Sequence, residues 1–96
     1  MKKLLAVMCM VVSTVASGSE LLDVARDLGR CTAAEFHMTQ DKERFNERYD
    51  LAVATMGKKQ FGIYGYGMGL IDGIAMAGEN HLIVEIYNEC KAKHNM

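Results

Sequence analysis

The sequence predicts an all-α protein: a small four-helix domain that follows a cleaved N-terminal signal peptide and is closed by one disulfide bond. Three observations support this prediction. Apolar residues recur at helical spacing along most of the chain that follows a short apolar leader. The length of 96 residues, half of them hydrophobic, fits a single small globular domain. Two of the three cysteines lie outside the leader and can pair with each other.

The N-terminal leader has the pattern of a bacterial export signal. Two lysines follow the first methionine, a continuous apolar run extends from Leu4 to Val12, and small residues surround the expected cleavage point near Ser17 or Gly18. The apolar stretch is too short for a membrane-spanning helix, which needs about 20 residues. We therefore expect residues 1–17 to be removed, leaving no stable membrane anchor and a protein located in the periplasm.

Residues 18–96 are predicted to form a single helical domain with a mildly acidic surface. They carry nine basic and twelve acidic residues, which gives a net charge of −3 with neutral histidines. This balance offers no electrostatic argument for binding nucleic acid, and no nucleic-acid partner is expected.

Cys31 and Cys90 are expected to form the disulfide, because paired thiols of an exported protein normally oxidise. On the chain-entropy model, closing a loop of this length stabilises the fold by about 4 kcal/mol. The two residues lack the CxxC spacing that is typical of redox and metal motifs.

The first helix is predicted to begin at Ser19, whose hydroxyl can cap the free amides of the first turn. Its expected apolar face consists of Leu21, Val24, Ala25, Leu28 and Cys31. The helix can continue to Phe36, although Gly29 weakens its middle.

A second helix is predicted to begin at Thr39 or Asp41, either of which can serve as its N-cap. Its expected apolar face consists of Phe45, Tyr49, Ala52, Val53 and Met56. Gly57 stands where a left-handed C-terminal cap is expected.

The glycine-rich stretch from Phe61 to Gly78 is the most unusual feature, and two periods compete in it. Alternating glycines between residues 64 and 70 are typical of a strand, whereas a longer pattern with a spacing of three and four residues predicts a helix. The helical pattern consists of an apolar stripe (Phe61, Tyr64, Met68, Ile71, Ala75) and a small-residue stripe (Gly65, Gly69, Gly73, Ala77). We favour the helix, in which each glycine costs about 1 kcal/mol relative to alanine. The expected compensation is a ridge without side chains that another helix, a ligand or a partner can approach closely.

The last helix is predicted after Asn80, which can cap it. Its expected apolar face consists of Ile83, Ile86, Tyr87 and Cys90. The β-branched residues between positions 81 and 87 leave a strand open as an alternative.

No catalytic motif is present, and the three histidines are too scattered to indicate a metal site, so we expect a protein that is not an enzyme and has no metal or cofactor. The expected contacts are with another protein, made by the glycine-rich helix and its neighbours. The candidate partner-binding residues are Tyr64, Gly65, Tyr66, Gly69, Asp72 and Gly73.

The pattern Gly65-Tyr66-x-x-Gly69-x-x-Asp72-Gly73 resembles the helix motif of the Rap/Tai immunity proteins. These are small exported helical proteins of Gram-negative bacteria that neutralise peptidoglycan-cutting amidase toxins of type VI secretion. The resemblance implies an inhibitor or immunity-type partner of a peptidoglycan hydrolase or toxin. Independently of the resemblance, a homodimer is left open. Ile63 stands where members of that family typically carry a cysteine.

A second resemblance, in architecture, is to the HdeA-like periplasmic acid chaperones, which are exported, helical and closed by one disulfide between an early and a late cysteine. It implies an alternative function, in which the fold opens at low pH and exposes apolar surface to unfolded clients.

Overall fold

The computed structural model describes residues 18–96, which form four α-helices and no strand. The helices are α2 (Gly18–Thr39), α3 (Lys42–Thr55), α4 (Lys58–Met76) and α5 (Asn80–His94). The prediction of a four-helix all-α domain is confirmed, and the strand alternatives for the glycine-rich stretch and for residues 81–87 are excluded. The predicted signal peptide lies outside the described residues.

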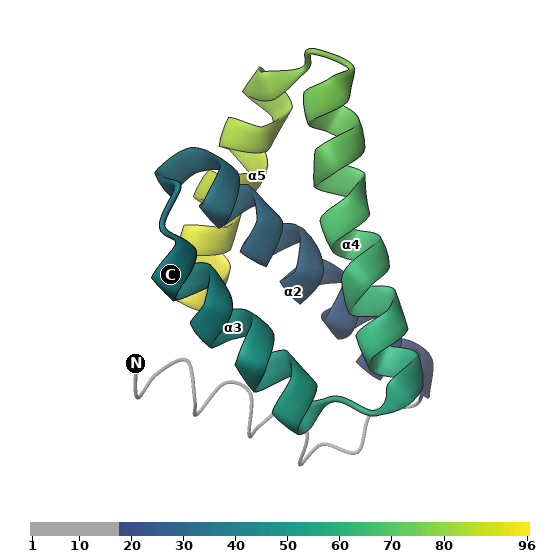
Figure 1. Ribbon diagram of the computed structural model, residues 1–96. Coiled ribbons are helices and arrows are strands. Elements are labelled where there is room, and N and C mark those ends of the chain that lie inside the picture. The colour runs from purple at the N-terminus through teal and green to yellow at the C-terminus, as the bar shows by residue number, and fades with distance from the viewer. Residues whose placement is uncertain (1–17) are drawn as a thin grey trace.

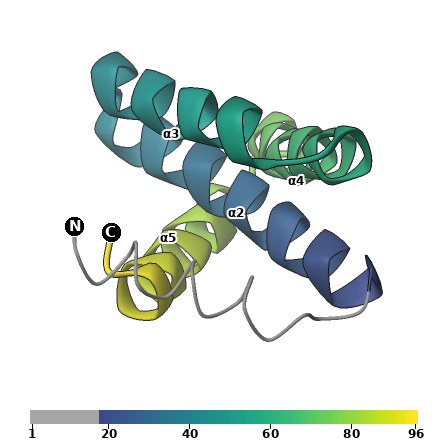
Figure 2. The same cartoon turned by 90° about the horizontal axis from the view of Figure 1, so that it is seen from below.

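Helix α2 is the centre of the fold and contacts each of the other three helices (Figure 1). Figure 2 shows α3 and α4 on one side of α2 and α5 on the other. The most extensive contact of α2 is with α4. Helices α4 and α5 are joined by a short turn in which Gly78 has a φ of 79°, a left-handed conformation that favours glycine. None of the helices in the described part of the chain is long and apolar enough to cross a lipid bilayer.

The helix ends agree in part with the predicted caps. Asp41 is the N-cap of α3, and its carboxylate accepts a hydrogen bond of 3.0 Å from the amide of Arg44. The expected left-handed cap at Gly57 is wrong, because Gly57 has a φ of −73° and is the N-cap of α4. Its amide donates to the side-chain oxygen of Gln60 at 2.8 Å. Asn80 is the first residue of α5 rather than its cap, which is Glu79.

The core consists of two small clusters of buried residues on either side of the middle of α2. The first cluster contains Ala25, Ala52 and Tyr64, and the second contains Ala34, Ile71 and Ile83. The predicted apolar stripe of α4 packs toward these clusters, with Tyr64 and Ile71 each only 1% exposed.

Helix α3 is packed less fully than its apolar pattern predicted. Val53 is 55% exposed and Tyr49 is 36% exposed, because α3 rests on the domain along a narrow strip centred on Ala52. Aromatic rings extend this strip. Phe45 contacts Phe36 of α2 with ring centroids 5.1 Å apart, and Tyr49 contacts Phe61 of α4 at 5.6 Å.

Where α2 and α4 cross, their backbones are in contact, and a glycine on each helix makes this possible. A Cβ atom at Gly29 would lie 2.0 Å from the carbonyl oxygen of Tyr64, and one at Gly67 would lie 2.1 Å from the carbonyl oxygen of Arg26. Gly29 therefore allows the close approach of α4 in the middle of an unbroken α2.

The predicted disulfide between Cys31 and Cys90 is confirmed, with an S–S distance of 2.04 Å and Cα atoms 5.7 Å apart. It joins the middle of α2 to the last third of α5. Both cysteines are buried. The bond therefore closes the fold across the side of α2 opposite to α3 and α4.

Candidate functional site

The outer side of α4 carries a row of glycines that the rest of the domain leaves open. A Cβ atom built at any of these positions would meet nothing within 4 Å, and all of the positions are exposed. We call this row the glycine face, and it consists of Gly62, Gly65, Gly69 and Gly73. The spacing of three and four residues puts all four on one side of the helix, facing away from the buried stripe. Three of them were predicted as contact residues, and Gly62 extends the row by one turn.

Two of the other predicted residues lie on either flank of the glycine face. Tyr66 is 58% exposed, and Asp72 is also exposed. Met76, on the same side of the helix, is 89% exposed at the end of the row. The open surface is therefore a smooth strip of backbone with an aromatic ring on one edge and a carboxylate on the other.

One flank of the glycine face slopes into a groove of about 480 Å³ between α4 and the end of α2. On the α4 side, Gly65, Gly69 and Asp72 line this groove. Its remaining lining, apolar with two polar side chains, consists of Ala33, Phe36, His37, Gln40, Phe45 and Met68. Tyr66 lies outside the groove and lines a depression with Leu70 and with charged residues of α2 and α5 (Asp23, Arg26, Asp27, Arg30 and Lys93).

Tyr64 is not part of this surface, and the expectation that it contacts a partner is wrong for the folded protein. Its ring is buried between α2 and α3, with 1% of the residue exposed. Its hydroxyl donates a hydrogen bond of 3.0 Å to the hydroxyl oxygen of Thr32. The burial raises the pKa of Tyr64 above its ordinary value, an effect that the hydrogen bond to Thr32 partly offsets. Its role is in the core.

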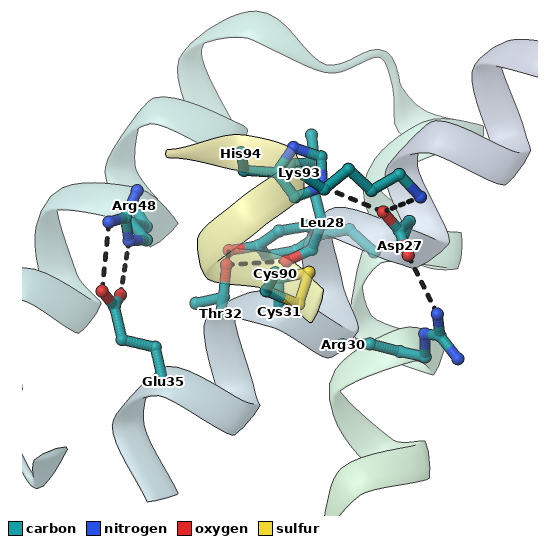
Figure 3. The surroundings of a disulfide bond; sticks show 11 residues. Asp27, Leu28, Arg30, Cys31, Thr32, Glu35, Arg48, Cys90, Lys93 and His94 are labelled. Carbon is teal, nitrogen blue, oxygen red and sulfur yellow. Dashed lines mark hydrogen bonds and ion pairs between the residues drawn. A yellow bond between two sulfur atoms is a disulfide. The ribbon is translucent and has the colours of Figure 1, made fainter. Parts of the chain in front are cut away.

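A cluster of polar side chains surrounds the disulfide (Figure 3). The carboxylate of Asp27 accepts hydrogen bonds from the His94 ring nitrogen at 2.9 Å and from Arg30 at 2.9 Å, and it pairs with Lys93 at 3.1 Å. The His94 Nε2 atom must carry a proton in this contact, because a carboxylate only accepts. The contact with His94 lowers the pKa of Asp27 most; partial burial opposes it, and Arg30 and Lys93 lower it further, so that the pKa lies well below its usual range.

Beside this cluster, Glu35 and Arg48 form a buried two-pronged ion pair between α2 and α3 (Figure 3). Their side chains are 6% and 15% exposed, respectively. The charged groups of Figure 3 thus tie two helices to α2 by polar contacts: α5 through Asp27 and α3 through Glu35.

Asp27, Cys31 and His94 also bring a carboxylate oxygen, a sulfur and a ring nitrogen within 4.8 Å of one another. In the disulfide form, the sulfur of Cys31 is bonded to Cys90. The three histidines are scattered along the sequence, so this cluster was not predicted. The signal was a spacing of four residues that occurs twice, from Asp27 to Cys31 and from Cys90 to His94, with the predicted disulfide joining the two.

The chain matches no protein family model, no curated protein and no solved structure.

Proposed function

We propose that this protein is a small exported binding protein of the periplasm that acts on another protein stoichiometrically, as an inhibitor or immunity-type partner. The surface that carries the proposal is the glycine face of α4 with Tyr66 and Asp72 at its edges. The resemblance of this stretch to the Rap/Tai immunity proteins supports a peptidoglycan hydrolase or toxin as the partner.

The single observation behind this proposal is that the glycine face has no use inside the domain. Each helical glycine costs about 1 kcal/mol relative to alanine. At Gly67 the cost is explained, because a Cβ atom would collide with α2, but at Gly65, Gly69 and Gly73 a side chain has free space. A domain of this size has a free energy of unfolding of only a few kcal/mol, so this cost is significant. A partner that approaches the backbone of α4 closely would account for the open glycines.

The shape of the surface favours a partner that presents a helix or an extended loop. Without side chains, α4 lets an incoming backbone come nearer than the usual helix separation of about 8–10 Å. Tyr66 offers an aromatic anchor of the kind that dominates many protein interfaces. Asp72 offers a carboxylate for a basic side chain or a free backbone amide.

The test is inhibition of a cell-wall hydrolase. The purified oxidised protein is titrated into periplasmic hydrolases and secreted amidases acting on isolated peptidoglycan, and release of soluble fragments is followed. We expect one enzyme to be inhibited at a one-to-one ratio, and Gly69→Leu to abolish inhibition because its side chain fills the glycine face. A Cβ atom at this exposed position meets nothing within 4 Å in the free protein, so the variant should fold.

The matched control is Ala54→Leu, which places the same side chain at an exposed position of α3, outside the glycine face. It should inhibit as the wild type does. Inhibition that survives in Gly69→Leu would reject the glycine face as the contact, and inhibition of no hydrolase would reject the function.

An acid chaperone is a second candidate function, supported by the buried ion pair of Glu35 and Arg48. Loss of this pair would release α3 from α2 and expose the aromatic rings beneath. Suppression of client aggregation at about pH 3, absent at neutral pH, would support this function. A protein that keeps its near-ultraviolet circular dichroism at that pH would rule it out.

A further inference from the structure

The residues around the disulfide form an arrangement that the proposed function does not use. Asp27 and Cys31 are one helical turn apart on α2, and Cys90 and His94 are one turn apart on α5. The disulfide brings the two pairs face to face. We propose that, when this disulfide is reduced, the four side chains bind one Zn²⁺ ion, with two thiolates, one imidazole and one carboxylate as ligands.

The donor set is the one that zinc prefers. Zn²⁺ in proteins is held tetrahedrally by cysteine sulfur, histidine nitrogen and carboxylate oxygen at about 2.0–2.3 Å, which puts ligand atoms roughly 3.3–3.8 Å apart. The oxygen of Asp27, the sulfur of Cys31 and the nitrogen of His94 already lie within 4.8 Å of one another. Hard cations such as Mg²⁺ and Ca²⁺ prefer all-oxygen sites, so the two sulfurs select against them.

The backbone can keep its place while the sulfurs separate. The Cα atoms of Cys31 and Cys90 are 5.7 Å apart, a separation that allows both thiolates to reach one ion. A cavity of about 40 Å³ lined by Cys31 and His94, among mostly apolar side chains, gives the Cys31 sulfur room to move. Cys31 and Cys90 are buried, so the two sulfurs are shielded from water.

The charges around the cluster also fit. Two thiolates, a carboxylate and Zn²⁺ leave one negative charge, and Arg30 neutralises it from the other oxygen of Asp27. Lys93, which now shares an Asp27 oxygen with His94, has a side chain that is 64% exposed and is free to swing into solvent when the ion takes its place. Arg30 then orients the carboxylate from outside, as second-layer partners of metal ligands do.

A phosphine can reduce the Cys31–Cys90 disulfide, with all atoms and electrons accounted for. The phosphine supplies two electrons, the S–S bond breaks, and water gives its oxygen to the phosphine and two protons to the sulfurs. Zinc binding then releases these two protons as the thiolates coordinate the ion. Helices α2 and α5 are thereby linked in both redox states. The disulfide links them in the oxidised protein, and the Zn²⁺ ion links them in the reduced protein.

The experiment is a metal titration of the phosphine-reduced protein without oxygen. Co²⁺ is added first, because a tetrahedral two-thiolate site gives visible d–d bands and a thiolate charge-transfer band. Zn²⁺ is then added in competition with a chromophoric chelator, and helicity is followed by circular dichroism. We expect one Zn²⁺ to bind, to displace Co²⁺ and to preserve or restore helicity, whereas the oxidised protein shows none of these signals.

Matched variants distinguish Zn²⁺ binding by this folded site from Zn²⁺ binding by two thiols of an unfolded chain. His94→Gln and Asp27→Asn should weaken Zn²⁺ binding by roughly 10- to 100-fold or more. The same changes away from the site, His81→Gln and Asp23→Asn, should leave it unchanged, because both side chains are exposed. The proposal is overturned if the reduced protein binds no Zn²⁺, if His94→Gln binds it as the wild type does, if a reduced and unfolded chain regains no helicity with Zn²⁺, or if the oxidised protein binds it equally.

Discussion

At the scale of single residues, Asp27 makes polar contacts with three charged or titratable side chains. It joins α2 to α5 through His94 and Lys93, and it also holds Arg30 of its own helix. Its side chain is 17% exposed, so these contacts are only partly weakened by solvent. The free energy that they contribute depends on Asp27 being ionised.

This dependence predicts how stability changes with pH. In the folded protein the pKa of Asp27 lies well below the ordinary value of 3.8, which the unfolded chain keeps. Its stabilisation is therefore complete well above that ordinary value and is lost as the pH falls below it toward the folded pKa. Asp27→Asn should lower the free energy of unfolding by about 2 kcal/mol at neutral pH, measured by urea denaturation.

The difference between Asp27→Asn and the wild type should shrink as the pH is lowered below 3.8. Asp23→Asn serves as the control, because its pair with Arg26 is exposed and should contribute less than about 0.5 kcal/mol. A difference that stays constant from neutral to acid pH would show that Asp27 acts through packing rather than through its charge.

At the scale of the helices, α4 shows that two kinds of glycine occur in one element. Gly67 lies on the side that touches α2, where only a hydrogen atom fits, and the glycine face lies on the opposite side with open space. The same residue type therefore serves close packing on one side and leaves the other side bare. The two kinds should respond to an added methyl group in opposite directions.

Gly65→Ala, Gly69→Ala and Gly73→Ala should each raise the free energy of unfolding, by up to about 1 kcal/mol, because alanine favours the helix and its methyl group meets nothing. Gly67→Ala should lower it by about 3 kcal/mol or more, because its Cβ atom would lie 2.1 Å from the carbonyl oxygen of Arg26. Thermal and urea unfolding of the four variants measure both effects. Destabilisation by all four would mean that the glycine face is packed in solution.

At the scale of the whole molecule, the disulfide compensates for a small core. The buried hydrophobic residues outside the disulfide form two clusters of three residues, in which three of the six are alanine, and α3 is covered along one strip only. Such clusters provide little hydrophobic stabilisation. The Cys31–Cys90 bond, which closes a loop of 59 residues, supplies much of the difference by restricting the unfolded chain.

Replacing both cysteines by serine should therefore lower the free energy of unfolding by about 4 kcal/mol. The measurement is urea unfolding in the presence of a metal chelator, with the oxidised wild type under the same conditions as control. A loss below about 1 kcal/mol would show that helix packing alone maintains the domain.

Much of the fold could be predicted from local patterns. The spacing of Tyr64 and Ile71 identified the buried side of α4, and Asp41 identified the start of α3. Gly57 and Val53 were predicted wrongly, because both depend on how α3 meets its neighbours. A helical period identifies an apolar side but does not tell how much of that side another element covers.

The sequence by itself determined the helical class, the disulfide partners and the presence of a glycine row, because period, composition and cysteine number are properties of the chain. Only the tertiary structure decided which glycines are packed and which are open, that Tyr64 belongs to the core, and that Asp27 and His94 meet at the disulfide. These depend on where α4 and α5 cross α2. A helix crossing is set by contacts between residues distant in the chain, so no local pattern contains it.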